Sequence, residues 1–210
     1  MPGDVRTGAA QGRAASGTCV GHDRGVDEGH TIDITDRAAH AIVSGVTPKG
    51  LRVALVPYVE ELVPDSPSEY DEWGDGPRDA PPRALGRFLV EVTDAADMSA
   101  YAGMVSWHLE SYGPNPGSTA WNIGIALSPA VRGHGIGSVA QRLLAEWLLS
   151  TTDVERIEAS TDVENVPEQK ALERAGFTQE GILRSAQERA DGRHDLFVYS
   201  LLREDVHPQR

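Results

Sequence analysis

The sequence is poor in cysteine and contains no long apolar run. The single cysteine, Cys19, cannot form a disulfide within the chain, and it rules out a zinc site built from cysteine pairs. No apolar stretch approaches the roughly 18 residues that a membrane-spanning helix needs. Residues 1–17 carry charges and lack the apolar segment of a secretory signal. These absences predict a cytoplasmic protein.

Positive charge is also scarce. The chain has 32 Asp and Glu against 19 Lys and Arg, which gives a formal net charge of −13. Nucleic acids and anionic membranes would repel such a protein, so we expect neither as a partner. The 210 residues, 40% of them hydrophobic, are enough for one globular domain with a buried core.

Hydrophobic patterning divides the chain into four parts. Residues 1–29 hold seven glycines and no hydrophobic period, which predicts a disordered tail. Residues 30–50 read as an N-terminal extension, and residues 51–204 form the expected domain before a short tail at 205–210. Within the extension, four apolar residues follow Asp36 at helical spacing and predict a short helix that ends at Thr47-Pro48. The four are Ala39, Ile42, Val43 and Val46.

The periodicity changes along the domain. Strands are expected from Leu51 onward and at residues 87–93, 100–111, 119–127, 156–161, 178–184 and 194–202. A strong helical period spans residues 136–148, and a second helix begins after Asn165, with Glu168 as a capping-box residue, and ends at Gly176. This order predicts an α+β fold with a mixed, mostly antiparallel central sheet and flanking helices.

Residues 57–82 are strongly acidic, with eight Asp or Glu against one arginine. One interpretation is a solvated loop. The other is a recognition lid for a cationic amine, in which Tyr58, Tyr70 and Trp73 supply contact area.

A glycine-rich turn, Arg132-Gly-His-Gly-Ile-Gly-Ser138, joins an apolar strand to the strongest helix. Glycines let backbone N–H groups approach a ligand, and the first N–H groups of a helix lack internal partners. The turn therefore suits a phosphate or pyrophosphate, although such glycines also serve plain strand–helix joins. Gly135, Gly137 and Ala140 match the dinucleotide pattern GxGxxA, but several strands precede the turn where that fold expects one.

Arg132-x-x-Gly135-x-Gly137, placed after a strand and opening a helix, resembles the acyl-CoA signature of the GNAT superfamily of N-acetyltransferases. The following half resembles its ribosomal-protein-alanine acetyltransferase (RimJ/RimL)-like branch. The motifs that carry this second resemblance are, in order, Arg156-Ile-Glu-Ala-Ser, Glu164-Asn165, Gly176-Phe177, Glu180-Gly181-Ile-Leu-Arg184, then Gly192 and Asp195 before Tyr199-Ser-Leu-Leu-Arg203. The resemblance covers residues 51 to 204.

The resemblance implies a GNAT fold in which the strands at 119–127 and 156–161 splay apart around the pantetheine arm of acetyl-CoA. It also implies which residues hold this donor. They are Ile125, Ala126 and Leu127 for the arm, the turn of Arg132, Gly133, His134, Gly135, Ile136, Gly137 and Ser138 for the pyrophosphate, and Asn165. The acetyl group would pass directly to an amine, with a base for the ammonium proton and a donor for the leaving thiolate.

The acid and base are less well defined by the motifs. The wider family has a tyrosine, and the nearer branch a serine, at positions that are Leu172 and Glu168 here. Glu158, on a strand lining the expected cleft, is our candidate base, and Glu168 is a second catalytic candidate. His108 and Glu188 are further options. His108 and Glu110 share a strand face without a third ligand, so we expect no metal.

The resulting hypothesis is an acetyl-CoA-dependent N-acetyltransferase acting on a primary amine of a small molecule or a protein N-terminus, as a monomer or a homodimer. The acidic segment favours a cationic acceptor. Two alternatives stay open: a catalytically silent acyl-CoA-binding or regulatory domain of the same fold, and a small nucleotide-binding oxidoreductase.

Overall fold

The computed structural model describes residues 41–73 and 86–206, all of which belong to one structural unit, Asp36–Arg210. The expected tail at 1–29, Asp36 and Ala39 of the expected helix, and residues 74–82 of the acidic segment lie outside the described residues.

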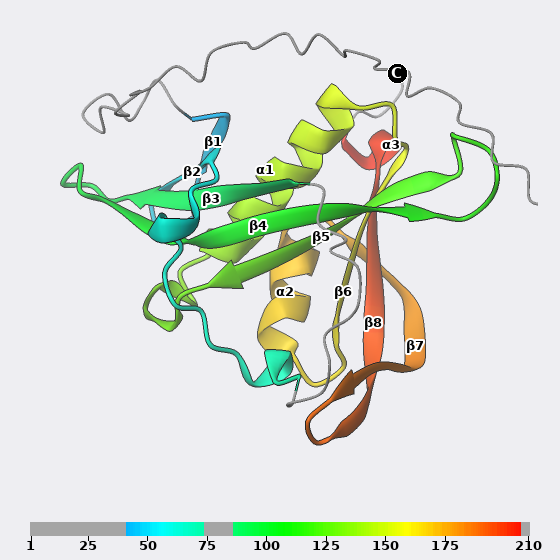
Figure 1. The fold of residues 1–210 in the computed structure, drawn as a ribbon. Coiled ribbons are helices and arrows are strands. Elements are labelled where there is room, and N and C mark those ends of the chain that lie inside the picture. Colours follow the sequence, from blue (N-terminus) through cyan, green and yellow to red (C-terminus); the bar gives the residue numbers. More distant parts are fainter. Residues whose placement is uncertain (1–40, 74–85, 207–210) are drawn as a thin grey trace, which may run out of the picture. The chain divides into compact units, whose positions relative to one another are not determined.

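Eight strands form a single sheet in the order β1-β2-β3-β4-β5-β6-β8-β7 (Figure 1). The strands are β1 (Val43–Val46), β2 (Arg52–Pro57), β3 (Gly86–Thr93), β4 (Ser99–Ser111), β5 (Thr119–Leu127), β6 (Arg156–Asp162), β7 (Thr178–Arg189) and β8 (Gly192–Leu202). Every neighbouring pair is antiparallel except β5 and β6. The predicted α+β class with a mostly antiparallel sheet is therefore confirmed.

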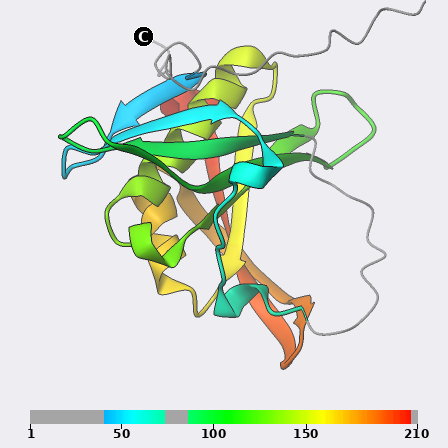
Figure 2. The ribbon, with the colours of Figure 1, turned by 60° about the vertical axis from the view of Figure 1, so that its left-hand side comes forward.

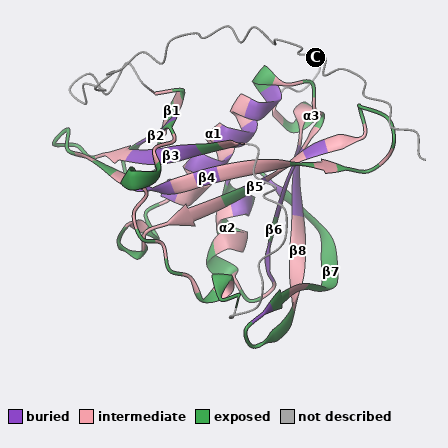
Figure 3. Cartoon of the chain, viewed as in Figure 1, coloured by how far each residue is buried: buried purple, intermediate pink, exposed green. Residues whose placement is uncertain are grey.

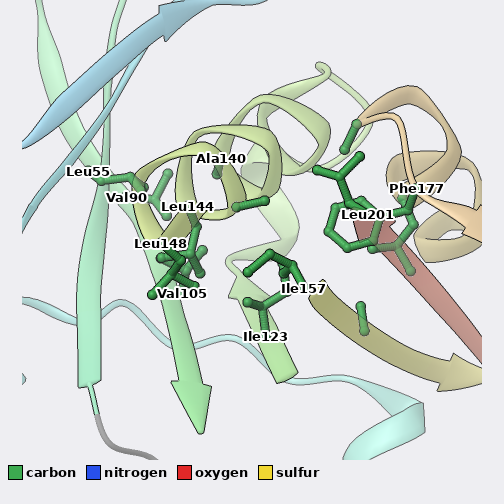
Figure 4. Close-up of a cluster of buried hydrophobic side chains, with 14 of the residues drawn as sticks. Leu55, Val90, Val105, Ile123, Ala140, Leu144, Leu148, Ile157, Phe177 and Leu201 are labelled. Carbon is green, nitrogen blue, oxygen red and sulfur yellow. The ribbon is translucent and has the colours of Figure 1, made fainter. Parts of the chain in front are cut away.

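Helix α1 (Ile136–Thr151) carries the core of the domain. Its buried side chains Ala140, Leu144 and Leu148 pack against Val105, Ile123 and Ile157 of the sheet (Figure 4). In Figure 3 this face of α1 and strand β6 are largely buried, whereas β7 is almost wholly exposed. The helical period expected from the sequence is confirmed as the face that turns toward the sheet.

Helix α2 (Val166–Arg174) has the ends that its sequence predicts. The side chain of Asn165 accepts a hydrogen bond from the N–H of Glu168 at 3.3 Å, which caps the first turn. After the helix, Gly176 has φ +93°, a left-handed conformation that glycine adopts at little cost. A short helix α3 (Arg203–Val206) and three 3₁₀ turns, η2 (Glu60–Leu62), η3 (Glu69–Asp71) and η4 (Pro129–Val131), complete the fold.

The helix expected before Thr47 is wrong in its described part. Val43–Val46 forms strand β1, antiparallel to β2, and the N–H of Ile42 bonds to the carbonyl of Leu55 at 2.8 Å. Gly45 lies against α1, where a Cβ atom would come within 3.2 Å of Val139. Pairing with β2 and close packing on α1 override an apolar spacing that fits a helix, because β-branched residues and glycine both weaken helices.

Candidate active site

Strands β5 and β6 pair over part of their length and then diverge, which forms a fork in the sheet. They pair only through Trp121–Ile157, Asn122–Glu158 and Ile123–Ala159. Beyond these rungs, residues 124–127 pair with β4 alone, and residues 160–162 pair with β8 alone. The two strands diverge in Figure 1. Residues 124–127 form the β5 arm of the fork, and in the described structure they make no strand pairing with β6. Ile125, Ala126 and Leu127 lie on this arm.

The glycine turn joins this arm of β5 to α1. Gly133 and Gly135 have φ +75° and +81°, so both adopt the left-handed conformation that favours glycine. Gly135 is the N-cap of α1 and provides no capping side chain, which leaves the first N–H groups of the helix, from Ile136 on, without a side-chain cap. Ser138 donates from Oγ to the Gly135 carbonyl at 3.0 Å, and His134 Nδ1 lies 2.8 Å from the Arg132 carbonyl oxygen. Left-handed glycines that lead into a helix N-terminus without a side-chain cap are an arrangement that suits an anion.

Arg132 has a role that the sequence did not indicate. Its guanidinium donates to the carbonyl of Leu127 from Nε at 3.0 Å and from Nη2 at 2.8 Å, and Nη2 also donates to the carbonyl of Pro67 at 2.7 Å. The carbonyl of Leu127 is therefore already engaged. Both acceptors are neutral, so these bonds leave the positive charge of Arg132 in place beside the turn.

A row of polar residues crosses the sheet just before the fork opens. His108, Asn122, Glu158 and Ser200 are direct cross-strand neighbours on β4, β5, β6 and β8. Directly opposed residues share one face of a sheet, and side chains alternate along a strand. Ile123 follows Asn122 on β5, and Ile157 precedes Glu158 on β6. Both isoleucines face α1. The polar row therefore lies on the face opposite the helices.

Glu158 is buried within this row, with 3% of the residue exposed. Its Oε2 accepts the hydroxyl hydrogen of Tyr112 at 2.5 Å, and its Oε1 accepts from Nε of Arg156. Burial, with the hydrogen bond to Glu158 as the next cause, raises the pKa of Tyr112 to about 12. Tyr112 follows β4 and lies 46 residues from Glu158 in the sequence, so no local sequence pattern could have indicated this hydrogen bond.

The guanidinium of Arg156 also binds Glu180 on β7 through two nitrogens, one of them at 2.8 Å from Oε1. Ser200 donates from Oγ to the same Glu180 oxygen at 2.7 Å. These bonds lower the pKa of Glu180 to about 2, with Arg156 as the larger cause. Arg156 thus holds two carboxylates, and Glu180 stays ionised.

Glu168 lies elsewhere, in the first turn of α2. Its carboxyl group bonds to the side chain of Gln141 on α1, and burial raises its pKa to about 7. Gln141 also donates to the carbonyl of Gly137 at 3.3 Å, which places Glu168 on the helix side near the glycine turn. The Glu168 side chain therefore does not close the capping box expected from the sequence. The structure puts Glu158 and Glu168 on different sides of the sheet.

The other two titratable candidates, His108 and Glu188, are each paired with a charged neighbour. His108 Nε2 lies 3.0 Å from Oε1 of Glu110 on the same strand. Glu188, in the exposed hairpin of β7 and β8, pairs with Arg193 at 3.2 Å. Among the described residues, no group of three or more His, Cys, Asp or Glu could hold a metal ion, and no helix is long and apolar enough to cross a membrane.

The described part of the acidic segment that follows β2, residues 58–73, connects the two arms of the fork (Figure 2). At the β5 side, the Pro67 carbonyl accepts from Arg132. At the β6 side, the hydroxyl of Tyr70 donates to the Glu164 carbonyl at 3.3 Å. The Glu72 carbonyl accepts from the N–H of Ala190 in the β7–β8 hairpin at 2.9 Å. All six of its carboxylate residues are exposed, namely Glu60, Glu61, Asp65, Glu69, Asp71 and Glu72.

Comparisons with known proteins complete the description. Among curated proteins, the uncharacterized N-acetyltransferase p20 of Bacillus licheniformis is 36% identical over 74 residues, which is 35% of this chain and 41% of the relative. The chain thus matches less than half the length of that relative. Among solved structures, a GNAT-family acetyltransferase from Bacillus anthracis is 21% identical with a TM-score of 0.47, over 56% of this chain and 66% of that one. The ribosomal-protein-S5-alanine acetyltransferase from Vibrio fischeri is 24% identical with a TM-score of 0.47, over 58% and 64%.

A family model describing an acetyltransferase (GNAT) domain matches residues 48–178. This range includes the fork, the glycine turn and α2. It takes in well over half of the sequence, and the chain therefore belongs to the GNAT family of acetyltransferases.

Proposed function

We propose that the protein transfers an acetyl group from acetyl-CoA directly to the primary amine of an acceptor. The observation that carries this proposal is the continuity of two features. The arm of β5 that does not pair with β6 leads through the left-handed glycines to the N-terminus of α1, which has no side-chain cap. One elongated ligand with an anionic middle and an uncharged, hydrogen-bonding arm would satisfy both.

On the donor side, the turn from Arg132 to Ser138 would hold the pyrophosphate, with Arg132 adding a full positive charge. Backbone groups of Ile125 and Ala126 would bond to the pantetheine arm, while the Leu127 carbonyl is held by Arg132. Asn165, at the start of α2, would contact the pantetheine arm of the donor. The bound donor would supply an activated thioester carbonyl, and the chain would supply orientation.

On the acceptor side, the polar row and residues 58–73 would form the amine site. The six exposed carboxylates of this segment favour a cationic acceptor, because they attract positive charge toward the fork. A basic protein N-terminus and a small polyamine both meet this description.

Glu158 is our proposed base, since it lies on the row beside the last paired rung of the fork. Glu168 is the second catalytic candidate, because a carboxyl with a pKa of about 7 can exchange a proton at neutral pH. Its position on the helix side, near the glycine turn, suits the leaving thiolate better than the incoming amine.

The test is release of CoA thiol from acetyl-CoA by the full chain. The amine probes are spermidine, a basic peptide with a free N-terminal alanine, and an acidic peptide of equal length. We expect turnover with a cationic probe, little with the acidic peptide, and a large loss of rate in Glu158→Gln. Acetyl-CoA binding without turnover of any amine would contradict the transferase proposal.

One observation favours the silent acyl-CoA-binding alternative. Leu172, at the position of the wider family's tyrosine, is fully buried in the core on α2 and presents no acid to a thiolate. The thiol-release assay together with a calorimetric titration separates the alternatives, because a silent domain would bind acetyl-CoA and release no thiol. An oxidoreductase would bind NAD instead.

A further inference from the structure

Tyr112 connects the solvent to the buried carboxylate of the polar row. The residue follows the last residue of β4, and its N–H bonds to the Ser118 carbonyl at 2.8 Å, which fixes the base of the β4–β5 connection. β5 lies between β4 and β6 in the sheet, so the side chain of Tyr112 spans β5 to reach Glu158. The residue is nevertheless 66% exposed.

Glu158 itself is poorly placed to meet an amine. It is 3% exposed, and each of its carboxylate oxygens already accepts a hydrogen bond, one from Arg156 and one from Tyr112. Arg156 is in turn held by Glu180, so its bond to Glu158 belongs to a wider ion-pair network. The accessible partner of Glu158 is the phenol of Tyr112.

We propose that Tyr112 is a catalytic residue that relays the amine proton to Glu158. This inference rests on the proposed function. As the neutral amine nitrogen forms its bond to the acyl carbon, one N–H proton passes to a lone pair of the Tyr112 oxygen. The bond between the acyl carbon and the sulfur breaks, and CoA leaves as the thiolate with that electron pair. The original hydroxyl proton passes from Tyr112 to Oε2 of Glu158. The nitrogen loses one proton, Glu158 gains one, and Tyr112 ends neutral.

The surroundings suit a relay better than a phenolate base. Glu158, Glu110 and burial all favour the protonated phenol, and Arg156 alone opposes them. Two further charged or titratable groups near this row, Glu180 and His108, are engaged by Arg156 and Glu110 respectively. Tyr112 therefore carries a proton at neutral pH, which it can give to Glu158 only as it receives another.

The experiment compares Tyr112→Phe with wild type, with Tyr101→Phe as the matched control. Tyr101 lies near the start of β4, the strand that Tyr112 follows, and it pairs with Glu91 of β3. In Tyr112→Phe we expect kcat to fall about a hundredfold, as is usual when a general acid–base group is removed. Acetyl-CoA affinity by calorimetry and the melting temperature should match those of Tyr101→Phe, because the ring stays in place.

A double variant, Tyr112→Phe with Glu158→Gln, tests whether the two groups act as one unit. A relay predicts that the double variant is no slower than the slower single variant. If the kcat losses of the two single variants multiply in the double variant, the relay is overturned. An unchanged kcat in Tyr112→Phe would also overturn it. A wild-type protein that releases no thiol with any amine would instead overturn the proposed function, and the relay with it.

Discussion

At Gly137, the second residue of α1, a substitution should change the stability of the helix and the affinity for the proposed donor in opposite directions. A Cβ atom there would lie 3.5 Å from Leu127 Cδ1 and 3.9 Å from Ile125 and Ala171, which are ordinary contacts. Gly137→Ala should therefore stabilise the helix by about 0.5–1 kcal/mol. The added methyl group points toward the arm of β5 proposed for acetyl-CoA, so we expect affinity to fall about tenfold.

Thermal unfolding and calorimetry measure the two effects, with Gly117→Ala in the β4–β5 connection as the control, since a Cβ atom there meets nothing within 4 Å. An unchanged acetyl-CoA affinity in Gly137→Ala would count against a donor at this place.

Glu168 predicts a pH-dependent stability. Burial raises its pKa from 4.5 to about 7, so between these values the folded protein binds more protons than the unfolded chain. The free energy of unfolding therefore falls as the pH rises through this window. At pH 8 the ionised group costs on the order of 3 kcal/mol. Glu168→Gln should be more stable than wild type at pH 8, with a much smaller difference at pH 5.

Urea unfolding at both pH values measures the difference, and Glu173→Gln, an exposed position on the same helix, is the control. An equal difference at the two pH values would show that the Glu168 carboxyl is not desolvated.

Residues whose role is local could be predicted from the sequence, and residues whose role is distant could not. Asn165 caps α2 and Gly176 ends it, because capping and left-handed turns depend on a few neighbouring residues. The bond of Arg132 to Pro67 spans 65 residues and that of Tyr112 to Glu158 spans 46. Only the folded chain reveals such contacts.

At the scale of elements, residues 58–73 are fastened to both arms of the fork, and Arg132 makes the bond on the β5 side. Arg132→Ala should loosen that end, so amide hydrogen exchange at residues 66–72 should become faster. The same change removes a positive charge from the turn, and acetyl-CoA affinity should fall more at low salt than at high salt.

Lys49→Ala is the control, because Lys49 Nζ donates to the Gly133 carbonyl at 3.3 Å without contacting the segment. Exchange that is as slow in Arg132→Ala as in the control would mean that Arg132 does not fasten residues 58–73.

Strands with clear alternation were predicted closely, and irregular ones were not. The expected strand at 119–127 coincides with β5. The expected strand at 178–184 is shorter than β7, which continues to Arg189. Register shifts follow Gln179 and Leu183, and Ser185 has φ +54°, so the alternation that marks a strand is lost there. At β1, tertiary pairing overrode the apparent helical period.

At the scale of the whole molecule, the domain division remains a proposal for residues 1–29. Their composition offers little apolar surface, so we expect their deletion to leave the melting temperature nearly unchanged. Deletion of residues 1–46 would also remove β1, which pairs with β2 along its full length, and should lower the melting temperature clearly. A large drop for the shorter deletion would contradict the proposed boundary.

The order of strands and helices was enough to predict the fold class, because the sheet follows the chain order through β6. The fork required more than this order. Its shape depends on where the β5–β6 ladder stops, and no residue pattern in either strand marks that point. The glycine turn was recognisable because left-handed glycines and an uncapped helix N-terminus are local features.

A calorimetric titration of the full chain with acetyl-CoA shows whether the fork and the glycine turn bind acyl-CoA. NAD serves as the control ligand, because the turn also matches a dinucleotide pattern. We expect micromolar binding of acetyl-CoA and none of NAD. No heat of binding with acetyl-CoA would contradict this expectation, and the glycine turn would then be only a join between β5 and α1.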